Sequence, residues 1–321
     1  MDGWLQWGTE LIVALQAAGV PALTRVMESF TFLGAELFYL LVMPALLWSY
    51  NASLGTRLGL ALLTSASLNA VLKVAFALPR PFWVDGRVRA LSIETSFGLP
   101  SGHAQNAVVL WGYLAVQVRR WWATIGALVL IAAISFSRVY LGVHFPGDVL
   151  TGWILGALFL ALFVALEKPA ALWLKERRLS SRVLVAVGLP LGLLVLGWLA
   201  VEASAARALP PEWAANFGRA VGGRLAFQPG SIDSLVAGAG ALLGFSVGAV
   251  LLDDWGRFRD TNRGWVRLAR FFVGLAGVVV LQFGLTALLP EGDGPRFARY
   301  ALVGFWISCG APRVFDALRL V

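Results

Sequence analysis

The sequence contains only two histidines, His103 and His144, and an aspartate, Asp148, follows the second of them by four residues. At that spacing a carboxylate can accept a hydrogen bond from Nδ1 of the imidazole and leave Nε2 free to react. An imidazole oriented in this way can act as a nucleophile, and a second histidine can transfer protons. Taken alone, His144 and Asp148 also fit a loop histidine beside an acid that caps the next helix.

Three basic residues accompany the two histidines, and together they suit a doubly charged anion. Lys73 and Arg80 are seven residues apart, which is two helical turns, so both can point the same way. Arg138 ends an apolar run shortly before His144. Considered singly, each has a simpler explanation, such as an interfacial lysine that extends its ammonium group to water, or an ordinary loop arginine. The three cations as a group favour a phosphate-like dianion.

The segment Pro100-Ser101-Gly102-His103 stands directly before an apolar run. Ser101 is a suitable N-cap, and the unpaired N–H groups at a helix N-terminus form a site for anions. Gly102 lets the backbone approach a ligand without a Cβ in the way. A well-capped helix start explains these residues equally well, except for His103 in the first turn. The three motifs together therefore indicate a phosphate site with nucleophilic and general-acid groups.

The elements that must position these residues are strongly apolar. The chain has 321 residues, of which 59% are hydrophobic and 14% charged, with a formal net charge of +8. Ordinary soluble domains are roughly 45–50% apolar and about 25% charged. The composition excludes a soluble globule, which needs more charge on its surface, and a disordered chain, which needs low hydrophobicity. We predict an all-α polytopic membrane protein, with no nucleic-acid partner because the basic residues stand in short loops between apolar runs.

A transmembrane helix needs about 20 mostly apolar residues. On that basis we predict a six-span catalytic core over residues 1–168 and a region of about four further spans, of unknown role, over residues 181–321. The first span has an amphipathic helix in the membrane interface as its alternative. The Gly- and Ala-rich stretch 231–250 suits close packing of helices. The predicted spans lie near residues 4–20, 32–50, 55–78, 101–118, 122–141, 147–166, 182–201, 231–252, 268–289 and 298–318.

The distribution of Lys and Arg predicts the orientation, since cytoplasmic loops carry an excess of basic residues. Such residues gather at positions 57, 119–120, 168–182 and 257–270. With a cytoplasmic N-terminus these loops lie inside, and the three motifs lie on the outer face. We therefore predict a multi-pass protein of a bacterial-type cytoplasmic (inner) membrane, with its active site on the periplasmic or extracellular side. Most of the net charge is then an orientation signal.

Together the motifs resemble the signature of the type-2 phosphatidic acid phosphatase superfamily, K-x6-R-P, then P-S-G-H, then S-R-x5-H-x3-D. Every signature position is filled at the family's spacing. The likeness covers roughly residues 25–166, and the apolar composition is similar to that of the lipid branch, such as bacterial phosphatidylglycerophosphate and undecaprenyl-pyrophosphate phosphatases. The chain reads Lys73…Arg80-Pro81, Pro100-Ser101-Gly102-His103 and Ser137-Arg138…His144…Asp148.

The resemblance implies a phosphohistidine mechanism without a metal or other cofactor. In this mechanism His144 attacks phosphorus, Asp148 orients His144, and His103 protonates the leaving oxygen and then activates water. The resemblance also implies a lipid-phosphate hydrolase that works at the bilayer on a substrate of the phosphatidic acid, phosphatidylglycerophosphate or polyprenyl pyrophosphate class. The residues that would hold the phosphoryl oxygens are Lys73, Arg80, Ser101, Gly102 and Arg138.

Two interpretations of the chemistry share this signature, because a lipid phosphotransferase would pass the same phosphoryl group to an acceptor other than water. Monoester and pyrophosphate substrates, and a monomer or a homo-oligomer, are equally compatible with it. In the loop that joins the first two motifs, Trp83, Arg87, Arg89 and Glu94 are candidates to touch a headgroup, with interfacial anchoring as the alternative. The loop 202–230 either lies over the mouth of the site or is a passive scaffold.

Overall fold

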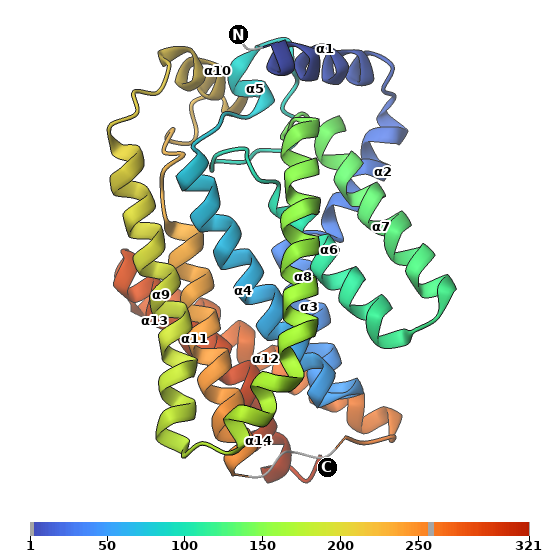
Figure 1. The fold of residues 1–321 in the computed structure, drawn as a ribbon, viewed down its shortest axis with the longest axis vertical. Helices are drawn as coiled ribbons and strands as arrows, with labels where there is room; N and C mark the ends of the chain where they lie inside the picture. Colours follow the sequence, from blue (N-terminus) through green and yellow to red (C-terminus); the bar gives the residue numbers. More distant parts are fainter. Residues whose placement is uncertain (1–2, 256–259, 321) are drawn as a thin grey trace. The chain divides into compact units, whose positions relative to one another are not determined.

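A computed structural model describes residues 3–255 and 260–320, and over these residues the chain is helical without any strand. The predicted all-α class is confirmed (Figure 1). Arg257 and Arg259, two of the basic residues behind the predicted orientation, lie outside the described residues. The helices are α1 (Gly3–Ala17), α2 (Pro21–Phe32), α3 (Glu36–Ala45), η1 (Leu46–Tyr50), α4 (Ala52–Phe76), α5 (Pro81–Val84), α6 (Gly102–Val118), α7 (Trp121–Tyr140), α8 (Pro146–Lys175), α9 (Leu179–Ala205), α10 (Pro211–Val221), α11 (Asp233–Asp254), α12 (Gly264–Leu288), α13 (Asp293–Phe305), η2 (Trp306–Gly310) and α14 (Ala311–Ala317).

The chain divides into two compact units, and each unit is assembled from segments that are distant in the sequence. Unit 1 comprises Met1–Phe38, Leu68–Ala161 and Gly197–Ile232, as far as these residues are described. Unit 2 comprises Tyr39–Ser67, Leu162–Leu196 and Asp233–Val321, with the same restriction. All three motifs lie in unit 1. The predicted division into residues 1–168 and 181–321 stays a prediction, and the compact units follow different boundaries.

Six helices in the described residues are long and apolar enough to cross a membrane, and the bent pair α2 and α3–η1 would make a seventh span. The other three predicted spans also correspond to helices, but these are shorter or broken. They are α1 with 15 residues, α6 with 17 residues, and α13, which is interrupted by the π-helix η2. The multi-pass architecture is therefore supported, and the number of ten spans stays a prediction.

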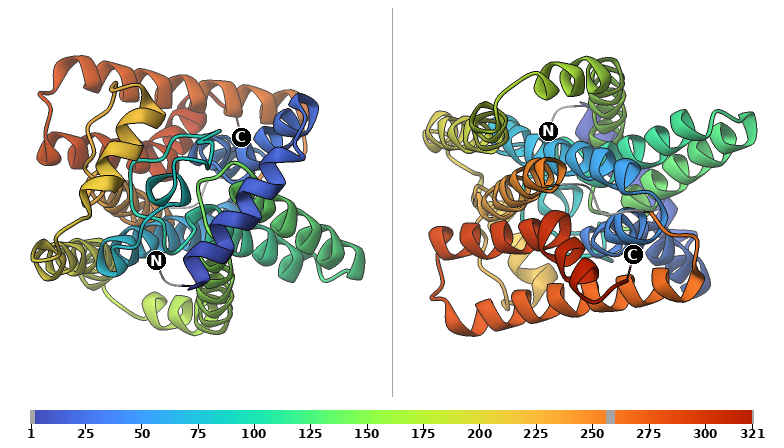
Figure 2. Two further views of the ribbon diagram at one scale, coloured as in Figure 1. Left: turned by 90° about the horizontal axis from the view of Figure 1, so that it is seen from above. Right: turned by 90° about the horizontal axis from the view of Figure 1, so that it is seen from below.

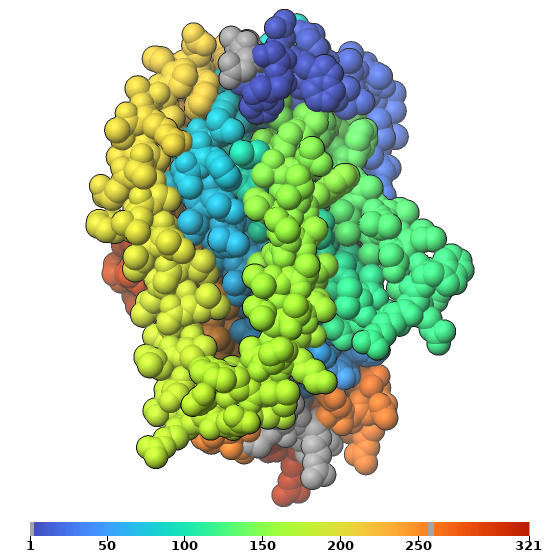
Figure 3. Space-filling view, viewed as in Figure 1, coloured from blue at the N-terminus to red at the C-terminus, as the bar shows by residue number. Residues whose placement is uncertain are grey.

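Helix α1 lies across the ends of α7 and α8 (Figures 1 and 2) and covers the start of α8 (Figure 3). Near its beginning, the rings of Trp4 and Phe145 lie 5.7 Å apart between centroids. Near its end, Gln16 Nε2 donates to the carbonyl oxygens of Arg89 at 2.8 Å and Tyr140 at 3.0 Å. Both ends of α1 therefore contact the same face of unit 1, which favours the interfacial alternative over a first span.

The placement of α1 bears on the predicted topology, which stays a prediction. His144 lies next to Phe145, so the face that α1 covers is the face that carries the third motif. A cytoplasmic N-terminus together with an outer active site requires α1 to cross the bilayer. An α1 that starts and ends on one face favours an N-terminus on the same side as the motifs.

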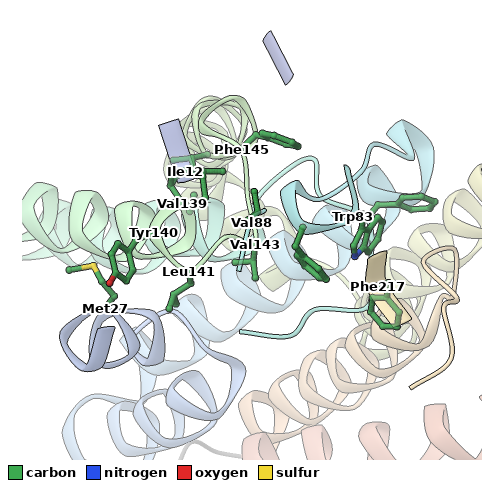
Figure 4. Close-up of a cluster of buried hydrophobic side chains, with 14 of the residues drawn as sticks. Ile12, Met27, Trp83, Val88, Val139, Tyr140, Leu141, Val143, Phe145 and Phe217 are labelled. Carbon is green, nitrogen blue, oxygen red and sulfur yellow. The ribbon is translucent and has the colours of Figure 1, made fainter. Parts of the chain in front are cut away.

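Helix α10 belongs to unit 1 and packs against α5. Asn216 Nδ2 donates to the carbonyl oxygen of Trp83 at 2.7 Å. The Phe217 ring lies 6.3 Å from that of Trp83, and the Phe227 ring lies 5.0 Å from it, between centroids. Figure 4 shows Trp83 and Phe217 on one side of the buried cluster, with Tyr140 and Met27 on the other. The segment 202–230 therefore supplies part of the hydrophobic core of unit 1.

In unit 2, α11 and α13 approach each other closely because small residues line their contact. A Cβ on Gly240 would stand 2.5 Å from the carbonyl oxygen of Phe297, and a Cβ on Gly244 would collide with that of Ala301. This contact confirms the close packing predicted for the stretch 231–250.

Replacing Phe217 with Ala should lower the thermal unfolding midpoint of the protein purified in detergent. The ring is fully buried, and Phe→Ala in a core typically costs about 3–5 kcal/mol. Leu225→Ala is the matched control, because this residue of the same segment is 48% exposed and should tolerate the change. Equal midpoints for the two variants would contradict the role of α10 in the core of unit 1.

Candidate active site

The three motifs converge at one end of unit 1. Lys73 lies in the last turn of α4, Arg138 in the last turn of α7, and Asp148 in the first turn of α8. Arg80 directly precedes α5, and His144 lies in the turn between α7 and α8. Helix ends thus bring together residues that are up to 75 positions apart in the sequence.

His144 and Asp148 are in contact, as their spacing predicts. The imidazole Nδ1 lies 3.3 Å from Oδ2 of Asp148, and the backbone N–H of Phe145 donates to the same oxygen at 2.9 Å. Both side chains are at most 2% exposed. The first turn of α8 favours a carboxylate through the helix dipole. The carboxylate is therefore fixed on the Nδ1 side of the ring.

The other ring nitrogen of His144 faces a cation. Nε2 lies 3.3 Å from Nη1 of Arg80. A guanidinium N–H can only donate, so Nε2 accepts and the ring proton belongs on Nδ1, toward Asp148. Burial, followed by the charges of Arg80 and Lys73, lowers the pKa of His144 well below its ordinary value. The imidazole is therefore neutral, and its Nε2 lone pair points toward the cations.

Arg80 joins the loop 85–101 to the turn that carries His144. Its guanidinium donates to the carbonyl oxygen of Ser96 at 2.6 Å, to that of Phe97 at 3.1 Å and to that of Val143 at 2.9 Å. Lys73 Nζ also donates to the carbonyl oxygen of Phe97, at 2.7 Å. Backbone oxygens thus satisfy the buried Arg80 and the partly buried Lys73, and the two cations in return fix the path of the loop.

Arg138 and Glu94 form an ion pair at the same place. Arg138 Nη1 donates to Thr31 Oγ1 at 2.5 Å, and its Nη2 donates to Oε1 of Glu94. The second carboxylate oxygen of Glu94 lies 3.9 Å from Nη2 of Arg80. Burial would raise the pKa of Glu94, but Arg80 and Arg138 outweigh it and lower the pKa to about 2. An ionised carboxylate therefore bridges two cations of the candidate site.

Among the four loop residues considered as headgroup contacts, Glu94 is the one that reaches this cation cluster in the described structure. Thr31 is a further contributor that sequence reasoning missed, because nothing in its local pattern distinguishes it from other polar residues near a helix end. The remaining three have other partners: Trp83 packs in the aromatic cluster, Arg87 pairs with Asp85 and Glu10, and Arg89 contacts Gln16.

The start of α6 has the predicted cap. Ser101 Oγ accepts from the backbone N–H of Ala104 at 3.4 Å, and the Ser101 N–H donates to the carbonyl oxygen of Asp148 at 3.0 Å. The second bond ties the N-terminus of α6 to that of α8. A Cβ on Gly102 would lie 3.0 Å from Oδ1 of Asn69, so close packing is one reason for the glycine.

His103 lies in the first turn of α6 and is partly exposed. A positive charge on His103 would lower the pKa of both Glu94 and His144, so His103 lies close enough to interact with them electrostatically. All predicted site residues therefore gather at one end of unit 1. Within residues 3–255 and 260–320, no three His, Cys, Asp or Glu side chains cluster in a way that could hold a metal ion. Metal-free chemistry stays a prediction.

Comparison with known families gives two matches. The PAP2 superfamily matches residues 54–171, and the family described as PAP2 superfamily phosphatase, transmembrane extension, matches residues 236–321. The first match contains all three motifs. Helix α10 falls between the two matched regions.

The regions aligned with curated relatives cover different shares of those proteins. Phosphatidylglycerophosphatase B of Bacillus subtilis is 34% identical over 155 residues, which are 44% of this chain and 74% of that protein. Undecaprenyl-diphosphatase of Sulfolobus acidocaldarius is 28% identical over 177 residues, 54% of this chain and 85% of that protein. Lipid phosphate phosphatase delta of Arabidopsis thaliana is 28% identical over 177 residues, 50% of this chain but only 42% of that protein.

One solved structure is also similar, the crystal structure of a transmembrane PAP2 type phosphatidylglycerolphosphate phosphatase from Bacillus subtilis. It matches with a TM-score of 0.46 and 28% identity, over 56% of this chain and 90% of that chain. The family assignment does not depend on this superposition. Because the superfamily match contains every motif position, and because 34% identity extends over 74% of a relative, the chain belongs to the PAP2 superfamily.

Proposed function

We propose that this protein is an integral-membrane lipid-phosphate phosphatase that hydrolyses a phosphate monoester or pyrophosphate through a phosphohistidine on His144, without a metal. The observation that carries the proposal is the arrangement of one imidazole. Its Nδ1 faces Asp148 at 3.3 Å, and its Nε2 lies among cations, 3.3 Å from Nη1 of Arg80. The names of phosphatidylglycerophosphatase B and undecaprenyl-diphosphatase, two relatives, support the class of substrate.

In the first half-reaction, the Nε2 lone pair of His144 attacks phosphorus while the bond from phosphorus to the leaving oxygen breaks. His103 gives its proton to that oxygen. Asp148 stabilises the positive charge that develops on the ring of His144. The products are a phosphohistidine and a lipid alcohol, or a lipid monophosphate where the substrate is a pyrophosphate.

In the second half-reaction, a water molecule gives a proton to His103 and attacks phosphorus. The bond between phosphorus and Nε2 of His144 breaks, and inorganic phosphate leaves. His144 returns to its neutral form with the proton on Nδ1, facing Asp148. His103 is protonated again, so the next cycle can begin.

The cations stabilise the charge that spreads over the equatorial oxygens during phosphoryl transfer. Lys73, Arg80 and Arg138 supply this positive charge, and Ser101 and Gly102 begin the helix whose free N–H groups add to it. Arg80 and Arg138 are each 1% exposed. Electrostatic interactions are stronger in such a shielded place than in water.

The surroundings suit a substrate with an apolar tail. On α8, Leu150, Ile154 and Leu158 are each more than half exposed, which fits helices that face lipid. A headgroup could reach the cations while its tail stays in the bilayer. We propose phosphatidic acid, phosphatidylglycerophosphate or a polyprenyl pyrophosphate as the class of substrate. The homo-oligomer stays an untested prediction.

The basic loops and α1 support a location for the proposed site. Arg119 and Arg120 connect α6 to α7 at the ends of these helices that are distant from Ser101 and Arg138. If this loop is cytoplasmic, the site lies on the outer face of an inner membrane. With α1 on the site's face, the N-terminus then lies outside as well.

Purified protein should release phosphate from at least one of phosphatidic acid, phosphatidylglycerophosphate and a polyprenyl pyrophosphate in the presence of excess chelator. Phosphate is measured in each reaction, with and without an added alcohol. No release from any substrate would exclude the proposed activity, and loss of release with chelator would exclude a metal-free mechanism. Transfer of phosphate to the alcohol instead of to water would indicate the phosphotransferase.

His144→Ala should reduce kcat by at least about 10³-fold, because the nucleophile is removed. Asp148→Asn should reduce kcat by at least about 100-fold, because Nδ1–H loses the carboxylate that orients the ring. Glu10→Gln, an exposed change on α1, is the control and should turn over normally. Normal turnover by His144→Ala would rule out this nucleophile.

His103→Asn should accumulate a phosphorylated enzyme with p-nitrophenyl phosphate. The nitrophenolate leaves without needing a proton, whereas water still needs a base in the second half-reaction. The adduct should be labile in acid, stable in base and absent from the double variant with His144→Ala. Quantitative release of phosphate by His103→Asn without such an adduct would contradict the assigned base.

A further inference from the structure

Glu94 places a negative charge where the proposed function requires a phosphate oxygen. Its carboxylate contacts Nη2 of Arg138 and lies 3.9 Å from Nη2 of Arg80. Both arginines are among the residues proposed to hold the phosphate. The Glu94 side chain is 29% exposed, whereas those of Arg80 and Arg138 are 1% and 2% exposed. Glu94 therefore stands at the more open edge of the cluster.

Arg138 has five N–H donors, and the contacts with Thr31 and Glu94 use two of them. Nη1 donates to Thr31 and Nη2 to Glu94, while Nε is buried without a hydrogen-bond partner. Nε–H and the neighbouring Nη2–H form a planar fork that matches two oxygens of one phosphate. The carboxylate of Glu94 engages one arm of that fork. A phosphate that takes both arms must replace Glu94 at Nη2.

Arg80 is arranged differently. Its N–H groups donate to Ser96, Phe97, Val143 and His144. Since these hydrogen bonds already satisfy the guanidinium, the nearby carboxylate of Glu94 only offsets its charge. Replacing the carboxylate of Glu94 by a phosphate would therefore add a hydrogen bond at Arg138 but not at Arg80. The exchange brings one bond to the orphaned Nε and replaces the bond at Nη2.

We propose that Glu94 is an internal substitute for the phosphate group, which occupies Arg138 in the free enzyme and is displaced when substrate binds. This inference rests on the proposed function, because it deepens the description of the same site. It implies that Glu94 competes with every phosphate, including the inorganic phosphate that the reaction leaves behind. Glu94 is then a positioning residue that speeds product release by returning to Arg138.

The test measures the binding of orthovanadate, which resembles phosphate, to the full-length protein in detergent. Glu94→Gln should bind orthovanadate about tenfold more tightly than the wild type, because one charge-assisted hydrogen bond no longer competes. Glu94→Asp keeps the charge but shortens the side chain, so it should also bind more tightly. Glu10→Gln removes an equal charge from an exposed ion pair with Arg87 and should bind as the wild type does.

Binding is read from the rise of the thermal unfolding midpoint with orthovanadate, which requires no turnover. The experiment therefore stands even if none of the lipid phosphates is hydrolysed. Where turnover is measurable, inhibition by inorganic phosphate should become stronger in Glu94→Gln in the same proportion.

Unchanged or weaker binding by Glu94→Gln would overturn the proposal, since Glu94 would then support Arg138 instead of competing for it. Tighter binding by Glu94→Gln alone, with Glu94→Asp equal to the wild type, would also overturn the proposal. The negative charge at position 94 would then weaken anion binding by repulsion, without the carboxylate having to occupy Arg138. If Glu94→Gln fails to fold, Glu94→Asp decides the question.

Discussion

The burial of positive charge at one end of unit 1 is the constraint on which the site depends. Arg80 and Arg138 are each 1% exposed, and a buried guanidinium without partners would be strongly destabilising. Arg80 is satisfied by backbone oxygens from Ser96, Phe97 and Val143, whereas Thr31 and Glu94 satisfy Arg138 in part and leave its Nε without a partner. The loop 85–101 must therefore fold over the cations, because its carbonyl and carboxylate oxygens are their ligands.

This dependence extends to a part of the chain that lies outside the superfamily match. Phe97 accepts hydrogen bonds from Lys73 and Arg80, and its ring lies 6.2 Å from that of Trp83 between centroids. Trp83 in turn packs against Phe217 and Phe227. The segment around α10 thus supports, through two layers of aromatic rings, the loop that satisfies the cations. A mobile Phe97 carbonyl would leave Lys73 and Arg80 short of a partner.

The sequence predicts the residues of the site better than it predicts their partners. Lys73, Arg80, His144 and Asp148 are recognisable because their spacing matches helix turns and a family signature. Thr31 and Glu94 meet Arg138 across 107 and 44 residues, and no local periodicity encodes such contacts. Hydropathy similarly leaves two interpretations of α1, because an apolar helix that lies on a bundle and one that crosses a bilayer have similar compositions.

The cations that would bind the phosphate also keep His144, the proposed nucleophile, neutral. Burial, Arg80, Lys73 and Arg138 all lower the pKa of His144, so Nε2 carries a lone pair beside the guanidinium of Arg80. A dianion that arrives at this place cancels part of that positive charge. Attack by His144 then creates positive charge on its ring. That charge lies beside the carboxylate of Asp148, and the bound phosphate offsets the neighbouring cations. The same arrangement therefore disfavours protonation of His144 in the free enzyme and would favour the charged ring of the proposed phosphohistidine once the phosphoryl group is bound.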